Sequence, residues 1–399
     1  MTNIILRHGK GESLKRFHPW VFSGAIFKID GPSLQEGDIV NVVESIPTPE
    51  GYEYAFVAKG HYQIGSIAVR VLTFQDEPID RRFWLSRIHE AWMVRKRLGL
   101  VRPDNTMFRL VHGEGDQLPG LVVDLYADTA VMQAHSVGMH FSRQDIADVI
   151  HEATEGRVKH VFYKSETTLP FKAHLGAKDG FLTGHTDVNV AVENGLQFHI
   201  DWLEGQKTGF FVDQRDNRAL LETYAKGKNV LNMFCYTGGF SVYAMRGGAL
   251  SVHSVDASAK AIELTNRNIA LNFPDDPRHE AFCEDAFKYL ERAGGDYELI
   301  ILDPPAFAKH KDALRNALKG YTRLNAIAFR KIRPGGIVFT FSCSQAVDKE
   351  QFRLAVFTAA AQSRRHVRIL HQLHQPADHP INIYHPEGEY LKGLVLYVE

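Results

Sequence analysis

Cysteine is scarce in this sequence, with only three residues in 399, at positions 235, 283 and 343. Three widely spaced cysteines cannot build a disulfide framework, and no paired spacing indicates a zinc site. Long apolar runs are also lacking, since no stretch approaches the roughly 18 uninterrupted residues of a membrane helix. The N-terminal text MTNIILRHGKGESLKRF has only a short apolar run before its charges, unlike a signal peptide. We therefore expect a cytoplasmic protein with no metal site and no membrane span.

Net charge is nearly absent as well. The chain has 46 Lys and Arg against 47 Asp and Glu, a formal charge of −1. A polyanionic partner would therefore need a local basic site, because the chain as a whole does not attract one. Hydrophobic residues make up 44% and charged residues 23%, which is typical of soluble globular proteins and excludes disordered and fibrous classes.

The length favours two or three domains, and the pattern of elements favours three. Residues 1–73 consist of short β-like runs and predict a small β-rich module. Residues 74–190 predict a middle α+β domain that begins with a linking helix at about 80–99. Residues 191–399 begin with a hairpin-like pair, LQFHIDW and KTGFFVD, and continue with apolar runs separated by helix-length segments. That alternation predicts an α/β fold with a Rossmann-like parallel sheet.

Two phosphate-binding motifs are missing from this last domain: the G-x-G-x-x-G fingerprint and the G-x-x-x-x-G-K-[ST] loop. A glycine turn is nevertheless present, at Gly238 and Gly239 after a strand-like run. Asp256 follows about eighteen residues later, where an acid can bind a ribose diol. An acid placed to bind a ribose, without a phosphate-binding motif, favours S-adenosylmethionine (SAM) over NAD, FAD and ATP, because SAM has a ribose but no pyrophosphate.

Acidic residues follow two further strand-like runs. Asp285 comes after the third run, where its carboxylate can bind an exocyclic amine such as that of adenine. Asp303, Pro304 and Pro305 come directly after the fourth run, YELIIL. Open α/β sheets bind ligands at this carboxyl edge, and the prolines stiffen the loop. We expect Asp303 to face a planar substrate there.

Cys343 ends the next strand, in the sequence Ser342-Cys343-Ser344. A cysteine at a strand end is more often a small buried hydrophobe than a nucleophile. Its place beside Asp303 and the expected methyl donor favours catalysis, because a thiolate can attack carbon 6 of a pyrimidine and activate carbon 5. Cys235 and Cys283 are expected to pack structurally.

Motifs along nearly the whole chain carry a family resemblance. They are RFHPWVFSGAI (16–26), RLVHGEGDQLPGLVVDLY (109–126), GFFVDQRDNR (209–218), FCYTGGFS, VDAS, the DPP loop, SCS, and DHP with PEGEYLKG. Together they resemble bacterial PUA-domain class I SAM-dependent methyltransferases that make 5-methylcytosine in large-subunit (23S) ribosomal RNA. The resemblance implies a PUA domain, a middle domain and a Rossmann-like catalytic domain, with Cys343 and Asp303 as catalytic residues. The expected cofactor-binding residues are Gln214, Arg218, Phe234, Tyr236, Thr237, Gly238, Asp256, Ser258, Asp285, Asp303 and Pro304.

Two alternatives stay open at this point: methylation of a guanine or adenine nitrogen, and a catalytically inactive RNA-binding assembly factor. Enzymes that methylate exocyclic amines use an [DN]PP-aromatic loop, whereas here Ala306 follows the prolines and Phe307 comes one place later. Other RNA cytosine-5 methyltransferases carry a second cysteine in this loop to aid product release, and this chain has none. The base that removes the carbon-5 proton is open, with His379 as one candidate against a solvated surface role.

RNA binding has local support in the charge pattern. Between Arg81 and Arg102 there are seven basic residues and one acid, Glu90. A basic helix can neutralise RNA phosphates, although a helix face that is only exposed to solvent would have the same charge pattern. The expected RNA-binding residues are Lys10, Lys15, Arg16, Trp20, Arg81, Arg82, Arg95, Lys96 and Arg97. The expected partner is unpaired or loosened, protein-free ribosomal RNA, and an exposed edge of the first module could support a homodimer.

Overall fold

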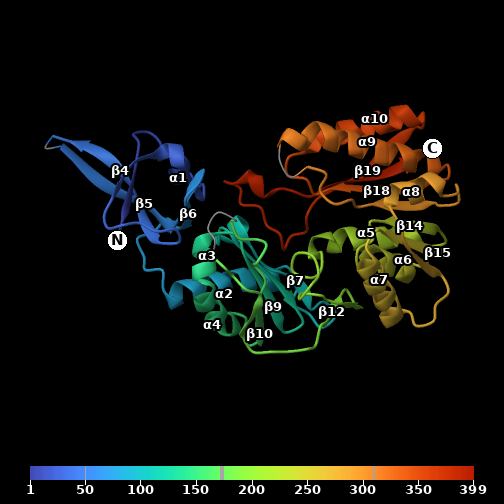
Figure 1. Ribbon diagram of the computed structural model, residues 1–399, viewed down its shortest axis with the longest axis horizontal. Helices are drawn as coiled ribbons and strands as arrows, with labels where there is room; N and C mark the ends of the chain where they lie inside the picture. Colours follow the sequence, from blue (N-terminus) through green and yellow to red (C-terminus); the bar gives the residue numbers. More distant parts are fainter. Residues whose placement is uncertain (50, 171–174, 309–310) are drawn as a thin grey trace. The chain divides into compact units, whose positions relative to one another are not determined.

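The structure is a computed structural model that describes residues 1–49, 51–170, 175–308 and 311–399. The chain forms two compact units (Figure 1). The first comprises Met1–Val192, Ile200–Val212 and Ala377–Gly388, and the second comprises Glu193–His199, Asp213–Pro376 and Glu389–Glu399. Within the described ranges, no helix combines the length and apolar character needed to cross a membrane.

The first unit opens with the predicted β-rich module, a six-stranded sheet in the order β2-β6-β5-β4-β1-β3. Apolar residues such as Ile4, Val40 and Val69 are fully buried and form its core. The elements are β1 (Asn3–Leu6), α1 (Glu12–Lys15), β2 (Trp20–Phe22), β3 (Ile26–Asp30), β4 (Ile39–Thr48), β5 (Gly51–Tyr62) and β6 (Ile67–Thr73).

The expected linking helix follows as α2 (Arg81–Arg97), which Asp80 caps by accepting from the backbone of Arg82 and Phe83. Its apolar face packs on a five-stranded sheet in the order β11-β10-β9-β8-β7. The other elements are β7 (Met107–His112), β8 (Leu121–Tyr126), β9 (Thr129–Ala134), α3 (Val137–Phe141), α4 (Arg143–Ala153), β10 (His160–Tyr163) and β11 (Gly180–Thr183).

A short hairpin is present near residue 191, but its strands differ from the predicted pair. β12 (Val190–Glu193) pairs with β13 (Leu196–His199), which carries the start of LQFHIDW. The segment KTGFFVD, residues 207–213, forms no strand and ends in a 3-10 turn, Val212–Gln214. The prediction of KTGFFVD as a strand is therefore wrong. Its apolar residues Phe210 and Val212 are buried in irregular structure instead of a sheet.

The second unit confirms the predicted α/β class with its seven-stranded sheet, ordered β16-β15-β14-β17-β18-β20-β19. The first five strands in this order are parallel, and β20 runs antiparallel to both of its neighbours. In Figure 1, α5, α6 and α7 lie on one side of the sheet and α8, α9 and α10 on the other.

The strands of this sheet are β14 (Asn229–Met233), β15 (Ser251–Asp256), β16 (His279–Cys283), β17 (Leu299–Leu302), β18 (Gly336–Ser342), β19 (Val367–Leu373) and β20 (Lys392–Val398). The helices are α5 (Arg215–Ala225), α6 (Gly239–Arg246), α7 (Ala259–Asn272), α8 (Ala286–Arg292), α9 (Leu314–Lys331) and α10 (Lys349–Ser363). Strands β17 and β18 are buried along their whole length, which is why they read as continuous apolar runs. The predicted domain limits at residues 73 and 190 stay predictions.

Candidate functional site

The loops after five parallel strands meet at one edge of the seven-stranded sheet, because parallel neighbours end on the same side. The glycine turn follows β14, and Asp256 ends β15. Asp285 follows β16, Asp303 follows β17, and Cys343 follows β18. The structure thus brings the strand-end residues that the sequence singled out to one edge of one sheet.

The turn after β14 has an unusual backbone. Phe234, Tyr236 and Gly238 all have positive φ, of 58°, 47° and 76°, and for residues other than glycine this conformation is strained. A Cβ at position 238 would also approach Thr265 Cγ2 to 2.7 Å. Strain of this kind persists only where surrounding contacts hold it, and it clusters at ligand sites.

Side chains of distant residues help to hold this turn. The Tyr236 amide donates to Asp256 Oδ2 over 3.0 Å, and Thr265 Oγ1 donates to the Tyr236 carbonyl over 2.9 Å. Asn268 Nδ2 donates to the carbonyl of the buried Thr237 over 2.8 Å. Thr265 and Asn268 lie on α7, 29 and 31 residues from the carbonyls they bind, so local sequence patterns gave no sign of their role.

The carboxylates after β15 and β16 also organise the helices that follow them. Asp256 Oδ1 accepts from the Ser258 amide over 2.9 Å, and Ser258 Oγ caps α7. Asp285 Oδ1 accepts from the Lys288 amide over 2.9 Å and so caps α8. An ionised carboxylate has about four acceptor positions. Both acids therefore keep capacity for a hydroxyl or amine of a ligand while they fix the loops.

Asp303 lies in a small polar cluster. Gln214 Nε2 donates to Asp303 Oδ2 over 3.0 Å, and Asn217 Nδ2 orients Gln214 by donating to its Oε1 over 2.6 Å. The residue is partly accessible, but the buried surroundings of its carboxyl group, and then the charge of Asp213, raise the pKa of Asp303 to about 7. Pro304, next in the chain, is buried. Near neutral pH this carboxyl group therefore exists both as an acid and as a carboxylate.

Arg218 is buried and tied to Glu193. Its Nε and Nη2 donate to the two carboxylate oxygens of Glu193 over 2.8 and 2.7 Å, and the Tyr243 hydroxyl donates to Glu193 Oε1 over 3.0 Å. Arg218 is 3% exposed and Glu193 is fully buried. The predicted site included Arg218 but missed both partners, which come from distant segments of the chain.

The turn that carries Cys343 is anchored by the serines on either side of it. Ser342 Oγ donates to the Tyr321 hydroxyl over 2.9 Å, and that hydroxyl lies 2.9 Å from Ser344 Oγ. Lys392 Nζ donates to the Ser344 carbonyl over 2.7 Å. The SCS motif thus places its cysteine between two fixed points, and no sequence pattern pointed to Tyr321 or Lys392.

The three cysteines differ in their surroundings. Cys235 is buried, and burial raises the pKa of its thiol to about 12, which leaves it unreactive. Cys283 is exposed, so the expectation that it packs structurally is wrong, because its strand β16 is an edge strand with accessible residues. Cys343 is partly exposed at the strand-end edge.

The residues expected to bind RNA belong to the first unit, and most of them are at its surface. Lys10, Lys15, Arg16, Arg81, Arg82, Lys96 and Arg97 are exposed. Some form surface ion pairs, such as Lys96 with Glu155 over 2.7 Å. Trp20 is partly buried: its indole donates to Glu114 Oε1 over 2.9 Å, and its ring packs 4.2 Å from that of His385.

Arg95 is a correction to that set. Its side chain is fully buried, with Nη1 and Nη2 on the two carboxylate oxygens of Asp116 and Nη2 also on the Asp378 carbonyl over 2.7 Å. A guanidinium enclosed in this way does not reach an RNA phosphate. His379, the candidate base, is likewise buried in the first unit, with Nδ1 3.2 Å from Asp378 Oδ1, so the alternative of a solvated surface role is wrong.

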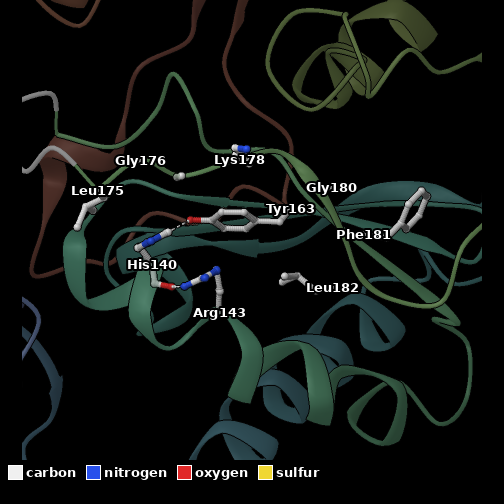
Figure 2. A pocket seen from close by; sticks show the side chains of 10 residues that line it. His140, Arg143, Tyr163, Leu175, Gly176, Lys178, Gly180, Phe181 and Leu182 are labelled. Atoms are coloured by element: carbon white, nitrogen blue, oxygen red, sulfur yellow. Dashed lines mark hydrogen bonds between the residues drawn. The ribbon is translucent and has the colours of Figure 1, made fainter.

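A cavity of about 280 Å³ lies in the middle domain beside β10 and β11 (Figure 2). His140 Nδ1 is 2.7 Å from the Tyr163 hydroxyl, and Arg143 Nη1 donates to the His140 carbonyl over 2.6 Å. The Arg143 guanidinium also lies 5.6 Å from the centre of the Tyr163 ring. All the described residues that line this cavity belong to the first unit, and none of them is a strand-end residue of the second.

The residues at the strand ends fit a SAM molecule. The carboxylate of Asp256 suits a ribose, and that of Asp285 suits an adenine amine. The glycine turn, with its positive φ angles, lets a ligand approach the backbone closely. Asp213 Oδ1 is buried and, within the described part of the chain, has no hydrogen-bond partner. This carboxylate suits the cationic methionine end of SAM, whose charge would stabilise it beside Asp303.

Comparison with known proteins agrees with this geometry. A family model described as S-adenosylmethionine-dependent methyltransferase matches residues 177–386, and a PUA-like domain matches residues 4–74. "Ribosomal RNA large subunit methyltransferase I" of Shewanella denitrificans is 39% identical over 403 residues, covering 99% of both chains. The protein of that name from Tolumonas auensis is 39% identical over 404 residues, again covering 99% of both chains.

Solved structures show the same fold. A chain described as a SAM-dependent methyltransferase from Streptococcus mutans covers 100% of both chains, with a TM-score of 0.81 and 21% identity. A methyltransferase structure complexed with SAH, the demethylated form of the cofactor, matches over 100% of both chains, with a TM-score of 0.82 and 21% identity. The predicted resemblance, fold class and cofactor are thus confirmed, and the chain belongs to the S-adenosylmethionine-dependent methyltransferases, with an N-terminal PUA-like domain.

Proposed function

We propose that this enzyme methylates carbon 5 of a cytosine in large-subunit ribosomal RNA through a covalent adduct with Cys343. The observation that carries the proposal is the placement of Cys343 and Asp303 at the ends of adjacent parallel strands, β18 and β17. The names of its full-length relatives support ribosomal RNA as the substrate.

Carbon 5 of cytosine is too weak a nucleophile to take a methyl group directly. Addition of the Cys343 thiolate to carbon 6 makes carbon 5 enamine-like, and SAM supplies the electrophilic methyl group. Loss of the carbon-5 proton to a base then re-forms the 5,6 double bond and expels the thiolate. Cys343 supplies the nucleophile that this chemistry requires and that nitrogen methylation does not.

Asp303 suits the pyrimidine ring in the same proposal. With a pKa of about 7, its carboxyl group is about half protonated at neutral pH. The acid form can donate to ring nitrogen 3, and the carboxylate form can accept from the exocyclic amine. Donation to nitrogen 3 draws electrons from the ring and favours thiolate addition at carbon 6.

The position of Phe307 argues against the nitrogen-methylating alternative. In amine-methylating loops of the [DN]PP-aromatic type, the aromatic residue follows the prolines directly. Here Ala306 has that place, and the Phe307 ring packs against Tyr321 with centroids 4.7 Å apart. The partly buried ring thus packs between the loop and α9, one place beyond the position of the aromatic residue in amine-methylating loops.

A second cavity supports RNA contact by the first unit. It measures about 600 Å³ and is lined by Phe17, Phe74, Arg82 and Arg87 among others. Phe17 is 49% exposed, and its ring meets Phe74 edge-on at 5.2 Å. Aromatic rings beside cationic side chains are how proteins hold unpaired nucleotides. We propose that unpaired, protein-free ribosomal RNA contacts this cavity and the exposed basic residues around it.

The test is incubation of the purified protein with labelled SAM and unmodified ribosomal RNA, followed by digestion and identification of the labelled nucleoside. The proposal expects 5-methylcytidine from the wild type and none from Cys343→Ala, which still binds SAM. Full methyl transfer by Cys343→Ala, or label in a guanine or adenine nucleoside, would contradict it. RNA affinity without SAM binding would favour the inactive assembly factor instead.

A further inference from the structure

Lys392 is a buried lysine next to the turn that carries Cys343. It begins β20 and pairs with Ser342 in the antiparallel register of β18 and β20. The residue is only 6% exposed, and its Nζ donates to the Ser344 carbonyl over 2.7 Å. The backbone of Lys392 thus lies opposite Ser342, before the cysteine, and its ammonium group binds Ser344, after the cysteine.

A lysine in such a place is unusual because burial disfavours its charged form. Burial lowers the pKa of Lys392 to about 8, and the nearby Cys343 opposes this shift. Below pH 8 the side chain is still mostly an ammonium ion. The hydrogen bond from Nζ to the Ser344 carbonyl holds the charge at the turn that carries Cys343, close enough for the two groups to interact electrostatically.

The other ionisable groups near Lys392 are Glu389, Asp348 and Lys349. Lys349 forms an ion pair with Glu389, and Asp348 accepts from the Gln351 amide as the N-cap of α10. Tyr321, whose hydroxyl binds the two serines beside Cys343, is kept neutral because burial raises the pKa of that hydroxyl. Cys343 is thus the group in the S-C-S segment whose ionisation the Lys392 charge can influence.

We propose that Lys392 is a positioning residue that stabilises the thiolate form of Cys343 and so prepares it to attack the pyrimidine. The inference rests on the proposed function, in which Cys343 is the nucleophile. In the step concerned, the thiol loses its proton to solvent, Lys392 keeps its own, and the sulfur electron pair then adds to carbon 6. The positive charge also stabilises the thiolate when it leaves after methyl transfer.

The test measures how fast Cys343 reacts with iodoacetamide between pH 6 and pH 10 in the full chain. Mass spectrometry of the Cys343 peptide separates its reaction from that of the exposed Cys283. Lys392→Met keeps the length and the apolar stem of the side chain but removes the charge. In this variant we expect the rate of Cys343 alkylation at pH 7 to fall about tenfold, the effect of a one-unit rise in the pH midpoint. Lys392→Arg keeps the charge and should restore most of the rate.

Lys331→Met is the matched control, because Lys331 Nζ also donates to a backbone carbonyl, that of Ala293, over 2.9 Å. A role of Lys392 in packing alone predicts the same pH midpoint in Lys392→Met and the wild type, and that result would overturn the inference. So would a folded Lys392→Arg whose midpoint resembles that of Lys392→Met.

A second measurement covers the case in which Lys392→Met does not fold. Coupling between two ionisable groups is reciprocal, so removing the thiolate with Cys343→Ala should lower the pH at which Lys392 titrates. Nuclear magnetic resonance of lysine labelled at Cε reports this titration, and an unchanged midpoint would refute the inference. Neither measurement needs RNA or SAM. Failure of the inference about Lys392 can therefore be told apart from failure of the proposed methylation.

Discussion

The side-chain oxygen of Ser344 accepts a 3.3 Å hydrogen bond from the Ala308 amide. This bond joins the turn that carries Cys343 to the loop that follows Asp303, so the loop after β17 and the turn after β18 share one buried network. The Tyr321 hydroxyl completes the network through both serines of the S-C-S segment. Buried polar networks of this kind fix geometry when every member is satisfied.

Tyr321→Phe should therefore damage both stability and catalysis. Removal of the hydroxyl leaves Ser342 and Ser344 without their shared partner, which we expect to lower the free energy of unfolding by about 1–3 kcal/mol. The single-turnover rate of methyl transfer should fall, while the pH midpoint of Cys343 alkylation should not move, because Tyr321 is neutral. Urea unfolding and rapid-quench kinetics measure the two effects.

Tyr224→Phe is a control for that variant. The Tyr224 hydroxyl lies 2.8 Å from His371 Nε2, between α5 and β19, so its loss removes a similar bond outside the S-C-S network. We expect Tyr224→Phe to lose stability without losing the single-turnover rate. Equal rates in Tyr321→Phe and the wild type would show that the network does not position Cys343.

The raised pKa of Asp303 predicts how stability depends on pH. Its folded value of about 7 lies above the ordinary 3.8, so between these values the folded state binds more protons than the unfolded state. Stability from this group is therefore full at low pH and is lost as pH rises from about 4 to 7. Asp303→Asn abolishes the titration and keeps an oxygen that can accept from Gln214.

Between pH 5 and pH 8 we expect the free energy of unfolding of the wild type to fall relative to that of Asp303→Asn. The difference between the two proteins should grow by about 1–3 kcal/mol, with the upper value set by the two pH units from 5 to the folded pKa of about 7, at about 1.4 kcal/mol each. Urea denaturation at the two pH values checks this. If the difference in free energy of unfolding between the two proteins is the same at both pH values, Asp303 has its ordinary pKa in the folded protein.

The strand-end site was predictable because each strand is a buried apolar run followed at once by a polar residue, as in LIIL before Asp303. The parallel order of strands then brings these residues together without further information. Lys392 and Glu193 were missed because they reach the site through pairing and packing of distant segments. Lys392 meets Ser342 across 50 residues, through an antiparallel register that composition does not reveal.

Arg95 was misplaced for a different reason. Counting charges along 81–102 ignores which face of the helix each one occupies. Trp84, Ile88 and Trp92 are buried on α2, and Arg95 continues this face at i+3 and i+4 spacing. The apolar periodicity of α2 was therefore enough to predict that Arg95 is buried. It did not reveal the ion-pair partner, Asp116, which lies in a later turn of the chain.

This difference between faces predicts opposite effects for two neighbouring arginines. Arg95→Met leaves Asp116 buried without its partner and should lower the free energy of unfolding by about 3–5 kcal/mol. Arg97→Met removes an exposed charge, so stability should change by no more than about 0.5 kcal/mol. RNA affinity should weaken, and the slope of log affinity against log salt should fall by about one. Titrations at several salt concentrations test this, and an unchanged slope would remove Arg97 from the RNA surface.

Phe17 gives the sharpest test of the proposed RNA cavity. Its φ is +62°, a strained conformation for any residue other than glycine, yet its ring is half-exposed at the cavity. Phe17→Gly removes the ring and relieves the strain, so the variant should be no less stable than Phe17→Ala. If a base stacks on this ring, both variants should bind single-stranded RNA more weakly by about 1–3 kcal/mol.

Phe27→Ala is the matched control, since Phe27 is 66% exposed on β3 of the same module and does not line the cavity. Fluorescence anisotropy with a labelled single-stranded RNA measures affinity for all three variants. Weak binding by both Phe17 variants, with normal binding by Phe27→Ala, places a nucleotide at the cavity. If Phe17→Gly binds RNA as tightly as Phe27→Ala and the wild type do, the half-exposed ring serves only its contacts with Phe74 and Tyr384, and RNA binds elsewhere on the basic surface.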